Sequence, residues 1–240
     1  MQSWSLGLLC FNEEESIELV LDKCYEVLPQ MTDDFELIVV NDGSTDNSLA
    51  ILKRYKEKNN NLIIIDHSKN KGIGAALHSA YDIVTKDNVL ITCGDGQFDV
   101  NELIPFKSFP SKTVLAFYRK DNRIYSIQRN ILSAFNKLFN KYFLGFDLYD
   151  VNWAKVYKRE ELDLITTKMK SSLVESEICS KLYCLGNEFK QIESEYLDRV
   201  GGVSKGSSFL VLRQAILEMF YLAFEILKFR IKLKFKKKKD

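Results

Sequence analysis

The chain is poor in residues that interrupt or replace regular secondary structure. Among its 240 residues are 3 Pro and 11 Gly, too few for long unstructured linkers, collagen-like repeats or low-complexity segments. Its five cysteines form no Cys-x-x-Cys pair, so the sequence indicates neither a disulfide framework nor a thiolate zinc site. The two histidines, His67 and His78, are not at metal-ligand spacing, and we expect structural or surface roles for both. Hydrophobic residues make up 46% of the chain, which suffices for the core of one sizeable folded domain.

The chain also has little net charge, +1 overall, but its charges are unevenly distributed. Residues 228–240 contain eight Lys or Arg and one acidic residue, whereas the rest of the chain carries a net charge of −6. Because this remainder is acidic and lacks interleaved basic and aromatic stripes, we expect no nucleic-acid partner. No basic segment precedes the first apolar run, so we expect no signal peptide and a cytoplasmic location.

Short apolar runs alternate with amphipathic stretches over the first hundred residues. The sequence predicts strands at 4–9, 36–41, 62–66 and 88–93, with helices at 15–28, 46–58 and 72–84 between them. This order predicts an α/β fold whose parallel strands bind ligands beyond their carboxyl ends. Farther along, strands are predicted at 113–117, 150–157 and 189–196, and helices at 124–143 and 173–185.

Polar residues follow three of the predicted parallel strands, where the carboxyl ends form one edge. Glu13 follows the first strand and Asp42 the second, and two carboxylates that face one crevice suit recognition of a base and a ribose. Asp95 and Gln97 follow the fourth strand, and their oxygens suit Mg²⁺ or Mn²⁺ on a diphosphate. Lys71 belongs to a glycine-containing helix start that can face a phosphate. Taken singly, each cluster is also explained as an ordinary turn or helix cap.

Basic side chains gather at two places in the second half of the chain. Arg119, Arg123 and Arg129 surround the start of the predicted long helix, and Arg199 and Lys205 flank a glycine-rich loop. Guanidinium and ammonium groups bind phosphate oxygens well, so these residues are candidate phosphate ligands. A solvated basic face is the alternative for each residue alone.

A series of short motifs follows in order along the chain. The motifs are Leu-Cys-Phe-Asn-Glu at 9–13, Asn-Asp-Gly-Ser-Thr-Asp at 41–46, Asn-Lys-Gly at 70–72, Cys-Gly-Asp-Gly-Gln at 93–97, the helix residues Arg129, Ser133 and Asn136, Asp-Val-Asn at 150–152, Glu177 ahead of Gly186, and Arg199, Gly202, Ser204 and Lys205. Taken in order, these motifs resemble those of the family-two inverting glycosyltransferases with the GT-A fold. Within that family they are similar to the polyprenyl-phosphate sugar transferases of the dolichol-phosphate-mannose synthase type. The resemblance extends from about residue 5 to residue 205, and several motifs in one order are far more specific than any one of them.

The resemblance implies a GT-A fold with a central mixed sheet and a nucleotide diphosphate sugar, UDP- or GDP-linked, as the donor. It also implies the donor-site residues: Phe11, Glu13, Asp42 and Lys71 for the nucleotide, and Asp95 and Gln97 for a Mg²⁺ or Mn²⁺ ion on the diphosphate.

The implied acceptor is a polyprenyl phosphate, undecaprenyl or dolichyl, at the cytoplasmic face of a membrane. Arg129, with Arg119 or Arg123, would receive the acceptor phosphate, and Arg199 and Lys205 would close the phosphate site. A phosphate acceptor is already an anion, so the protein has to align it for in-line attack rather than deprotonate it.

Two other functions stay open. If the acceptor is a glycan hydroxyl in polysaccharide or lipopolysaccharide synthesis, a carboxylate base is required, and Glu177 and Asp95 are the candidates. The first acid of the family's Asp-x-Asp is Cys93 here, and a thiol is a poor ligand for Mg²⁺ or Mn²⁺. We expect weakened or altered metal use, and a non-catalytic nucleotide-sugar-binding homologue is the alternative outside the enzymes.

Residues 206–240 are expected to form an appendage to a glycosyltransferase domain at 1–205. We predict an amphipathic helix with Phe209, Leu212, Ile216, Phe220, Ala223, Leu227 and Ile231 on one face and Arg213, Gln214, Glu218, Glu225, Lys228 and Lys232 on the other. Its longest stretch without charge, at 219–224, is far shorter than the ~20 residues that span a bilayer. The expected partner is the membrane surface, met by the helix and its basic tail. Packing on the domain or on the second subunit of a homodimer is the alternative.

Overall fold

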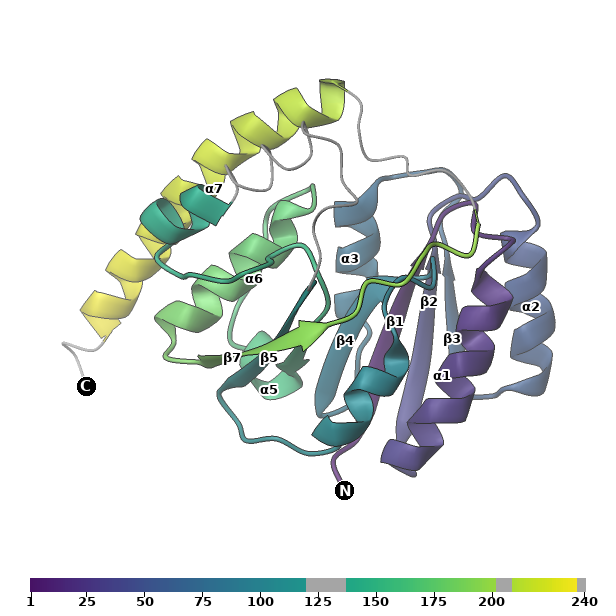
Figure 1. Ribbon diagram of the computed structural model, residues 1–240. Helices are drawn as coiled ribbons and strands as arrows, with labels where there is room; N and C mark the ends of the chain where they lie inside the picture. Colours follow the sequence, from purple (N-terminus) through teal and green to yellow (C-terminus); the bar gives the residue numbers. More distant parts are fainter. Residues whose placement is uncertain (120–136, 202–208, 237–240) are drawn as a thin grey trace.

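The computed structural model describes residues 1–119, 137–201 and 209–236 (Figure 1). Within these residues a seven-stranded sheet carries helices on both faces, in the strand order β3-β2-β1-β4-β6-β5-β7. The strands are β1 (Trp4–Cys10), β2 (Phe35–Asn41), β3 (Leu62–Asp66), β4 (Asn88–Cys93), β5 (Thr113–Arg119), β6 (Lys155–Lys158) and β7 (Glu188–Ser194). The helical elements are α1 (Ile17–Met31), α2 (Ser48–Lys58), α3 (Ile73–Tyr81), the 3-10 helix η1 (Val100–Phe106), the π-helix η2 (Asn140–Leu144), α5 (Arg159–Leu162), α6 (Leu173–Cys184) and α7 (Phe209–Lys236).

The sheet is parallel in its first half and mixed in its second. β1 pairs in parallel with β2 and β4, and β2 pairs in parallel with β3, as the alternation of strands and helices predicts. β6 runs antiparallel between β4 and β5, and β7 is parallel to β5. The mixed sheet expected from the resemblance is therefore confirmed.

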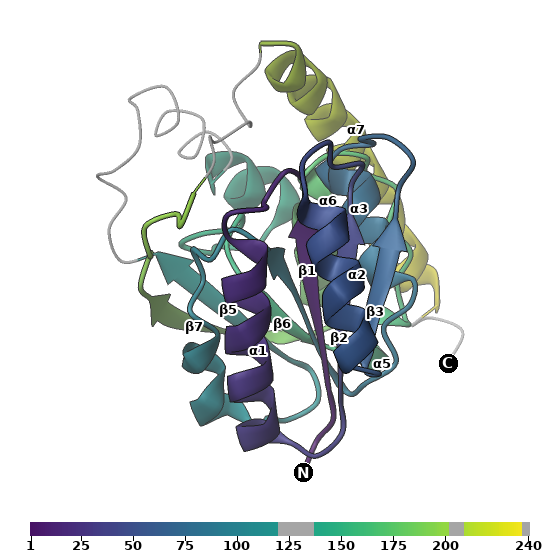
Figure 2. The same ribbon diagram turned by 90° about the vertical axis from the view of Figure 1, so that its right-hand side faces the viewer.

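Successive residues of β2 enter two separate hydrophobic cores. Leu37 and Val39 pack with α1 and η1 on one face of the sheet, while Ile38 and Val40 pack with α3 and α6 on the other. Figure 2 shows α1 and α2 side by side over the first face. All four side chains are fully buried, which explains the uninterrupted apolar run of this strand. On neighbouring β1, a side chain at Gly7 would meet the end of the Ile91 side chain of β4, so Ile91 packs over the space that the glycine leaves.

The strand predicted at 150–157 is wrong in its first half, because β6 begins only at Lys155. Asp150 Oδ1 accepts a hydrogen bond from the N–H of Asn152 at 3.0 Å, and Asp150 Oδ2 lies 2.6 Å from Nε of Arg119. A side chain that satisfies its own backbone in a turn competes with strand pairing. The helix predicted at 124–143 lies mostly outside the described residues, and its described end is the π-helix η2.

Helix α7 packs on α6, but with a face other than the predicted one. Among its residues 218–235, whose side chains the structure describes, the buried ones are Met219, Leu222, Glu225 and Ile226. Its exposed apolar side chains form an outer stripe that consists of Phe220, Phe224, Leu227, Ile231 and Phe235, and Tyr221 is exposed beside it. The predicted apolar residues Phe220, Leu227 and Ile231 thus point away from the domain, and Glu225, predicted to be on the polar face, is buried.

Glu225 is accommodated on the buried face by two ion pairs. Its carboxylate is 2.8 Å from Nζ of Lys168 and 3.2 Å from Nζ of Lys228, so the buried charge is neutralised. These contacts lower the pKa of Glu225, the hydrogen bond from Lys168 contributing most. With the acid accommodated, Leu222 and Ile226 are free to fill the core against α6.

None of the helices that the structure describes has the length and apolar character that a membrane span needs.

Candidate active site

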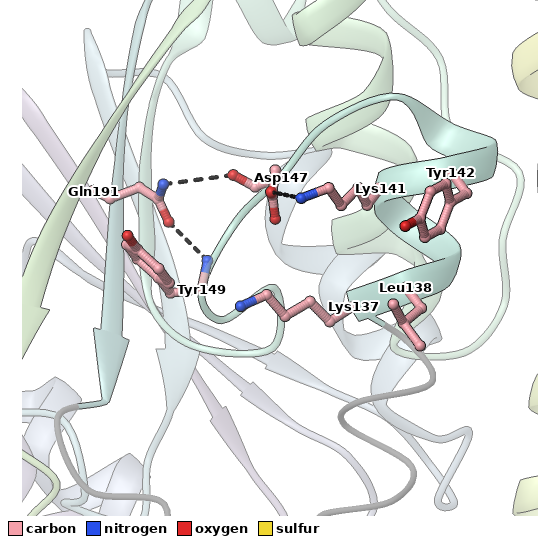
Figure 3. Close-up of a pocket in the computed structure, with 7 residues that line it drawn as sticks. All are labelled: Lys137, Leu138, Lys141, Tyr142, Asp147, Tyr149 and Gln191. Carbon is pink, nitrogen blue, oxygen red and sulfur yellow. Dashed lines mark hydrogen bonds and ion pairs between the residues drawn. The ribbon is translucent and has the colours of Figure 1, made fainter.

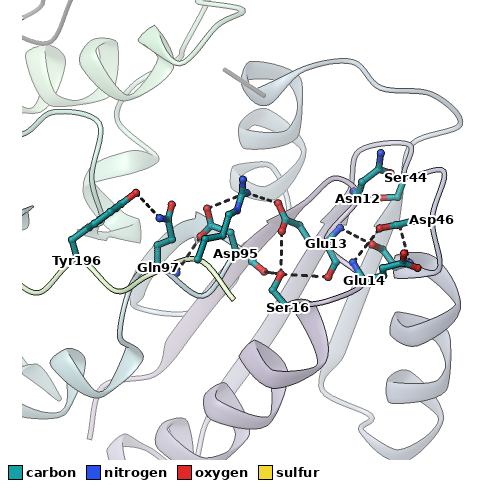
Figure 4. Close-up of polar contacts among 12 residues, drawn as sticks. Asn12, Glu13, Glu14, Ser16, Ser44, Asp46, Asp95, Gln97 and Tyr196 are labelled. Atoms are coloured by element: carbon teal, nitrogen blue, oxygen red, sulfur yellow. Dashed lines mark hydrogen bonds and ion pairs between the residues drawn. The ribbon is translucent and has the colours of Figure 1, made fainter. Parts of the chain in front are cut away.

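The carboxyl ends of β1, β2 and β4 form one polar edge of the sheet (Figure 4). Leu9 of β1 is in register with Val40 of β2 and Cys93 of β4, so the three following loops leave the sheet at the same level. The first two loops are tied together, since the N–H of Asn12 donates to Ser44 Oγ at 2.9 Å. The expectation that polar clusters converge at this edge is confirmed.

Further hydrogen bonds fix the loop that follows β1. Asn12, in the left-handed region at φ 54°, accepts with Oδ1 from the N–H of Thr45 at 2.7 Å. The N–H of Glu14 donates to Asp46 Oδ2 at 3.1 Å, and Asp46 Oδ1 accepts from the N–H of Ser48 at 3.0 Å. These bonds lower the pKa of Asp46 against the effect of its burial. Asp46 thus binds the N–H of Ser48, the first residue of α2.

Glu13 and Asp95 share one guanidinium group. Arg199 Nη2 lies 2.6 Å from Glu13 Oε1 and 3.3 Å from Asp95 Oδ2. Both carboxylate side chains are 11% exposed, and that of Arg199 is 22% exposed, so the cluster lies at the border of solvent. Ser16 Oγ lies 3.0 Å from Glu13 Oε2 and 3.1 Å from the carbonyl of Gly94, which joins the loops after β1 and β4.

The segment 196–201, here called the strap, carries Arg199 across this edge. The N–H of Leu197 donates to the carbonyl of Gln97 at 3.1 Å, and the Gln97 side-chain amide donates to the hydroxyl of Tyr196 (Figure 4). A side chain at Gly201 would come within 1.8 Å of the Glu15 carboxylate, so the strap lies against the start of α1. The contact of Tyr196 with Gln97 was not predicted from the sequence.

Asp42 is engaged by the loop that follows β3. Its Oδ1 accepts from the N–H of Lys71 at 2.9 Å, and its Oδ2 accepts from the N–H of Gly72 at 2.9 Å. His67 Nδ1 lies 2.7 Å from Asp42 Oδ1, and His67 Nε2 lies 2.9 Å from Ser79 Oγ. Buried His67 thus has the satisfied structural role that we expected. The contact of Asp42 with a nucleotide base stays a prediction.

The sequence profile of glycosyl transferase family 2 matches residues 5–153, more than half of the chain. The chain belongs to glycosyl transferase family 2. The family predicted from the motifs is thereby confirmed.

Relatives of this glycosyltransferase align with about 100 of its residues. Undecaprenyl-phosphate 4-deoxy-4-formamido-L-arabinose transferase from Photorhabdus laumondii is 34% identical over 100 residues, which are 41% of this chain and 31% of the relative. Poly-beta-1,6-N-acetyl-D-glucosamine synthase from Staphylococcus aureus is 34% identical over 99 residues, 41% of this chain and 23% of the relative. The chain thus matches less than a third of the length of either protein.

Solved structures share the fold over most of the chain. Glucosyl-3-phosphoglycerate synthase from Mycobacterium tuberculosis, in complex with Mn²⁺, UDP and phosphoglyceric acid, has a TM-score of 0.65 at 17% identity and covers 92% of this chain and 78% of its own. A mannosyltransferase from Pyrobaculum calidifontis, in complex with GDP-mannose and Mn²⁺, has a TM-score of 0.64 at 18% identity, with 92% and 64% covered. At these identities the likeness shows the fold, and the expected GT-A fold is confirmed.

The carboxylates of Glu13 and Asp95 can supply part of the ligand set of a divalent ion. Glu13 and Asp95 present oxygens, the ligands that Mg²⁺ and Mn²⁺ prefer, and both already bind a cationic nitrogen. The described part of the chain contains no group of three His, Cys, Asp or Glu side chains placed to hold a metal ion. An ion held here would therefore take its remaining ligands from a diphosphate or from water.

Cys93 does not add a ligand to this set. Burial is the main effect that raises the pKa of the Cys93 thiol to about 12, although part of the residue's surface is exposed at the end of β4. The charges of Asp95 and Glu13 act in the same direction, and Arg199 opposes them. The thiol is therefore neutral at physiological pH, and a neutral thiol is a poor ligand for Mg²⁺ or Mn²⁺.

Arg119 is the one predicted acceptor-phosphate ligand among the described residues. Its Nε lies 2.6 Å from Asp150 Oδ2, and its guanidinium carbon is 4.9 Å from the ring centre of Trp153 and 5.7 Å from that of Tyr196. Through Tyr196 it adjoins the strap. Arg123, Arg129 and Lys205 lie outside the described residues, so their predicted phosphate contacts stay predictions.

The carboxylate of Glu177 is engaged by the interior of the protein. Its side chain is fully buried, with Oε2 accepting from the N–H groups of Lys168 and Met169 at 2.7 and 3.0 Å. Its Oε1 lies 2.6 Å from Nζ of Lys181. Because both oxygens are engaged by the protein interior, Glu177 is a structural group, and Asp95 is the remaining candidate base.

A pocket of about 450 Å³ was missed by the sequence analysis (Figure 3). It lies beside β7 and η2 and is lined by Lys137, Leu138, Lys141, Tyr142, Asp147, Tyr149 and Gln191. Lys141 and Asp147 form an ion pair at 2.6 Å, and Nζ of Lys137 is 5.1 Å from the ring centre of Tyr149. None of the residues predicted for the donor site lines this pocket, and its basic and aromatic side chains come from segments without a recognisable motif.

Proposed function

We propose that this glycosyltransferase transfers a sugar, with inversion, from a UDP- or GDP-linked donor to a polyprenyl phosphate at the membrane surface. The observation that carries the lipid acceptor is the outer stripe of α7. It leaves five large apolar side chains exposed on the face that does not pack on the domain. The undecaprenyl-phosphate relative supports the same acceptor class.

The surroundings of the outer stripe favour an anionic lipid surface as its partner. Lys228, Lys232 and Lys234 are exposed on the same helix, and Nζ of Lys228 is 4.2 Å from the ring centre of Phe224. Aromatic and aliphatic side chains beside lysines are typical of helices that lie in the membrane interface. Such binding would keep the acceptor, whose phosphate stays at the headgroup level, near the carboxyl edge of the sheet.

In the proposed reaction, an oxygen of the acceptor phosphate forms a bond to the anomeric carbon, and the bond from that carbon to the donor diphosphate breaks on the opposite side. The nucleoside diphosphate leaves with its electron pair, and no proton has to be removed from the acceptor. Asp95 would hold the donor end of the site, while Arg119 and Arg199 supply positive charge for the two phosphate groups. A divalent ion, when bound, offsets the charge that develops on the departing diphosphate.

Transfer to a glycan hydroxyl is the second candidate, and the poly-beta-1,6-N-acetyl-D-glucosamine synthase relative favours it. A hydroxyl acceptor requires a base, and Asp95 would be the candidate once Arg199 releases it. A third candidate is a nucleotide-sugar-binding protein without activity, which the thiol at Cys93 supports.

Release of nucleoside diphosphate separates the three candidates. The full chain is incubated with UDP- and GDP-sugars and Mg²⁺ or Mn²⁺, with and without undecaprenyl phosphate in vesicles. Release that requires the lipid phosphate supports the proposal. Release that requires an oligosaccharide supports the hydroxyl acceptor. Nucleotide binding without release over the whole panel would overturn both in favour of the inactive homologue.

A further inference from the structure

Cys93 stands where the family motif has its first acid, and a second carboxylate, that of Glu13, lies beside Asp95 in the site. We propose that Glu13 and Asp95 together hold the divalent ion of the donor, and that Arg199 takes the place of this ion in the ligand-free protein. The inference rests on the proposed use of a nucleotide diphosphate sugar. It gives Glu13 a role different from the base contact that the motif resemblance implies.

The first support is the convergence of two carboxylates on one point. Oε1 of Glu13 and Oδ2 of Asp95 come from loops after different strands, yet both contact the same nitrogen of Arg199, at 2.6 and 3.3 Å. Two oxygens that reach one cationic nitrogen can also reach one metal ion, which needs shorter contacts of about 2.0–2.6 Å and hence a small inward movement. The guanidinium thus marks a cation position inside the site.

The second support is the way Glu13 is held. Its other oxygen, Oε2, is 3.0 Å from the hydroxyl of Ser16, and this fully buried hydroxyl also lies 3.1 Å from the carbonyl of Gly94. Glu13 is therefore anchored to the loop that carries Asp95. Asp95 Oδ1 in turn accepts from the N–H of Gln97 at 3.2 Å, which leaves Oδ2 directed to the cation.

The third support is that Arg199 is only partly satisfied where it lies. Its Nε is buried and has no hydrogen-bond partner among the described residues. Both carboxylate contacts of this guanidinium, which a loop rather than a helix or strand carries, go through its Nη2, and such a side chain is suited to exchange. When a metal ion and a diphosphate enter, Arg199 can release the carboxylates to the ion and bind the phosphate oxygens.

Binding of Mn²⁺ to the full chain tests this inference without relying on turnover. The signal of free Mn²⁺ in electron paramagnetic resonance is titrated with protein alone and with protein plus UDP or GDP. We expect Glu13→Gln to weaken nucleotide-dependent Mn²⁺ binding at least tenfold, as Asp95→Asn does, and Glu13→Asp to weaken it less. Arg199→Met is expected to tighten Mn²⁺ binding in the absence of nucleotide. Exposed Glu18, on the same segment, provides the control Glu18→Gln, which is expected to leave Mn²⁺ binding unchanged.

A charge relocation sharpens the test. Introducing Cys93→Asp into Glu13→Gln restores a second carboxylate beside Asp95, so Mn²⁺ affinity should recover. Circular dichroism and the midpoint of urea unfolding check that each variant is folded. If Glu13→Gln does not fold, Glu13→Asp serves as the test variant.

Two results would overturn the inference. Glu13→Gln could leave Mn²⁺ binding intact and weaken UDP or GDP binding in EDTA, which would assign Glu13 to the base. The wild-type chain could transfer sugar in EDTA and bind no Mn²⁺, which would overturn the inferred ion site and leave the proposed function supported. Mn²⁺ binding that depends on Glu13, without transfer to any acceptor, would instead support the inference and count against the proposed function.

Discussion

Two centres of this glycosyltransferase pair acidic side chains with one basic side chain, one centre in the interior and the other at the border of solvent. Glu177 is fully buried and is bound by Lys181 from its own helix and by two backbone N–H groups. Glu13 and Asp95 lie at the border of solvent and share one guanidinium from the strap. In the first centre every partner belongs to the packed interior, whereas in the second the cation comes from a loop. The sequence motifs alone made both centres candidates for chemistry.

The difference shows how a structural acid can be told from a functional one. Removing the cation from Glu177 requires the buried side chain of Lys181, one turn away on the same helix, to leave the packed interior. Removing it from Glu13 and Asp95 requires movement of the strap alone. Perturbing each centre should therefore affect different properties, stability for the first and ligand binding for the second.

The largest effect on stability is expected from Glu177→Ala. The substitution leaves the Lys181 charge and two backbone N–H groups without their partner in the interior, which costs about 3–5 kcal/mol in the free energy of unfolding. Equilibrium urea unfolding followed by circular dichroism measures it. As a control, Glu177→Met combined with Lys181→Met removes both charges and should recover much of the loss. A cost below about 1 kcal/mol would show that the pair is not the structural element described here.

The largest effect on activity is expected from Asp95→Asn. The loss of one negative oxygen from the cation position should lower the rate of sugar transfer roughly a hundredfold or more. The free energy of unfolding should change by less than about 1 kcal/mol, because Asn keeps the size of the side chain and an acceptor for the N–H of Gln97. Initial rates and urea unfolding are measured on the same preparation. A large loss of stability with normal activity of the folded fraction would place Asp95 with Glu177.

The next prediction extends the comparison to the two faces of α7. Phe224→Ser, Leu227→Ser and Ile231→Ser together should weaken binding to vesicles that contain anionic lipid at least tenfold, because each buried apolar side chain contributes about 1.5–3 kcal/mol. Stability should change little, since these side chains are exposed. Sedimentation with vesicles measures the binding.

The matched control is Leu222→Ala on the inner face of the same helix. It should destabilise the fold by about 2–5 kcal/mol and leave vesicle binding of the folded protein unchanged. Unchanged vesicle binding of the triple variant would exclude the outer stripe as a membrane contact.

The strands and loops could be predicted from the sequence because their causes lie in neighbouring residues, whereas the direction of a side chain depends on partners from distant segments. The first four strands follow from βα units in which each apolar run is bounded by its own turn, and their registers place the loops with Glu13 and Asp95 together. The direction of Glu13 could not be predicted, because it depends on Ser16 and the carbonyl of Gly94 from another strand.

For α7, the periodicity predicts an amphipathic helix but allows more than one apolar stripe. The stripe that packs on α6 includes Glu225, whose charge is neutralised in part by Lys168 from a segment 57 residues away. The burial of Glu177 could not be predicted either. Its spacing matches the family motif, but its burial depends on contacts with the loop before α6. Side chains whose partners come from distant segments are thus the part of the site that a single sequence does not determine.

The smallest effect is expected at the motif residue that differs most from the family. Cys93→Ser exchanges one neutral group for another, because the thiol, with a pKa of about 12, is protonated throughout the range from about pH 6 to 9. Sugar transfer should therefore change by less than about threefold, and its pH profile should coincide with that of the wild-type chain in this range. A profile that lost an inflection on substitution would show that a Cys93 thiolate takes part, and that position 93 belongs with Glu13 and Asp95 after all.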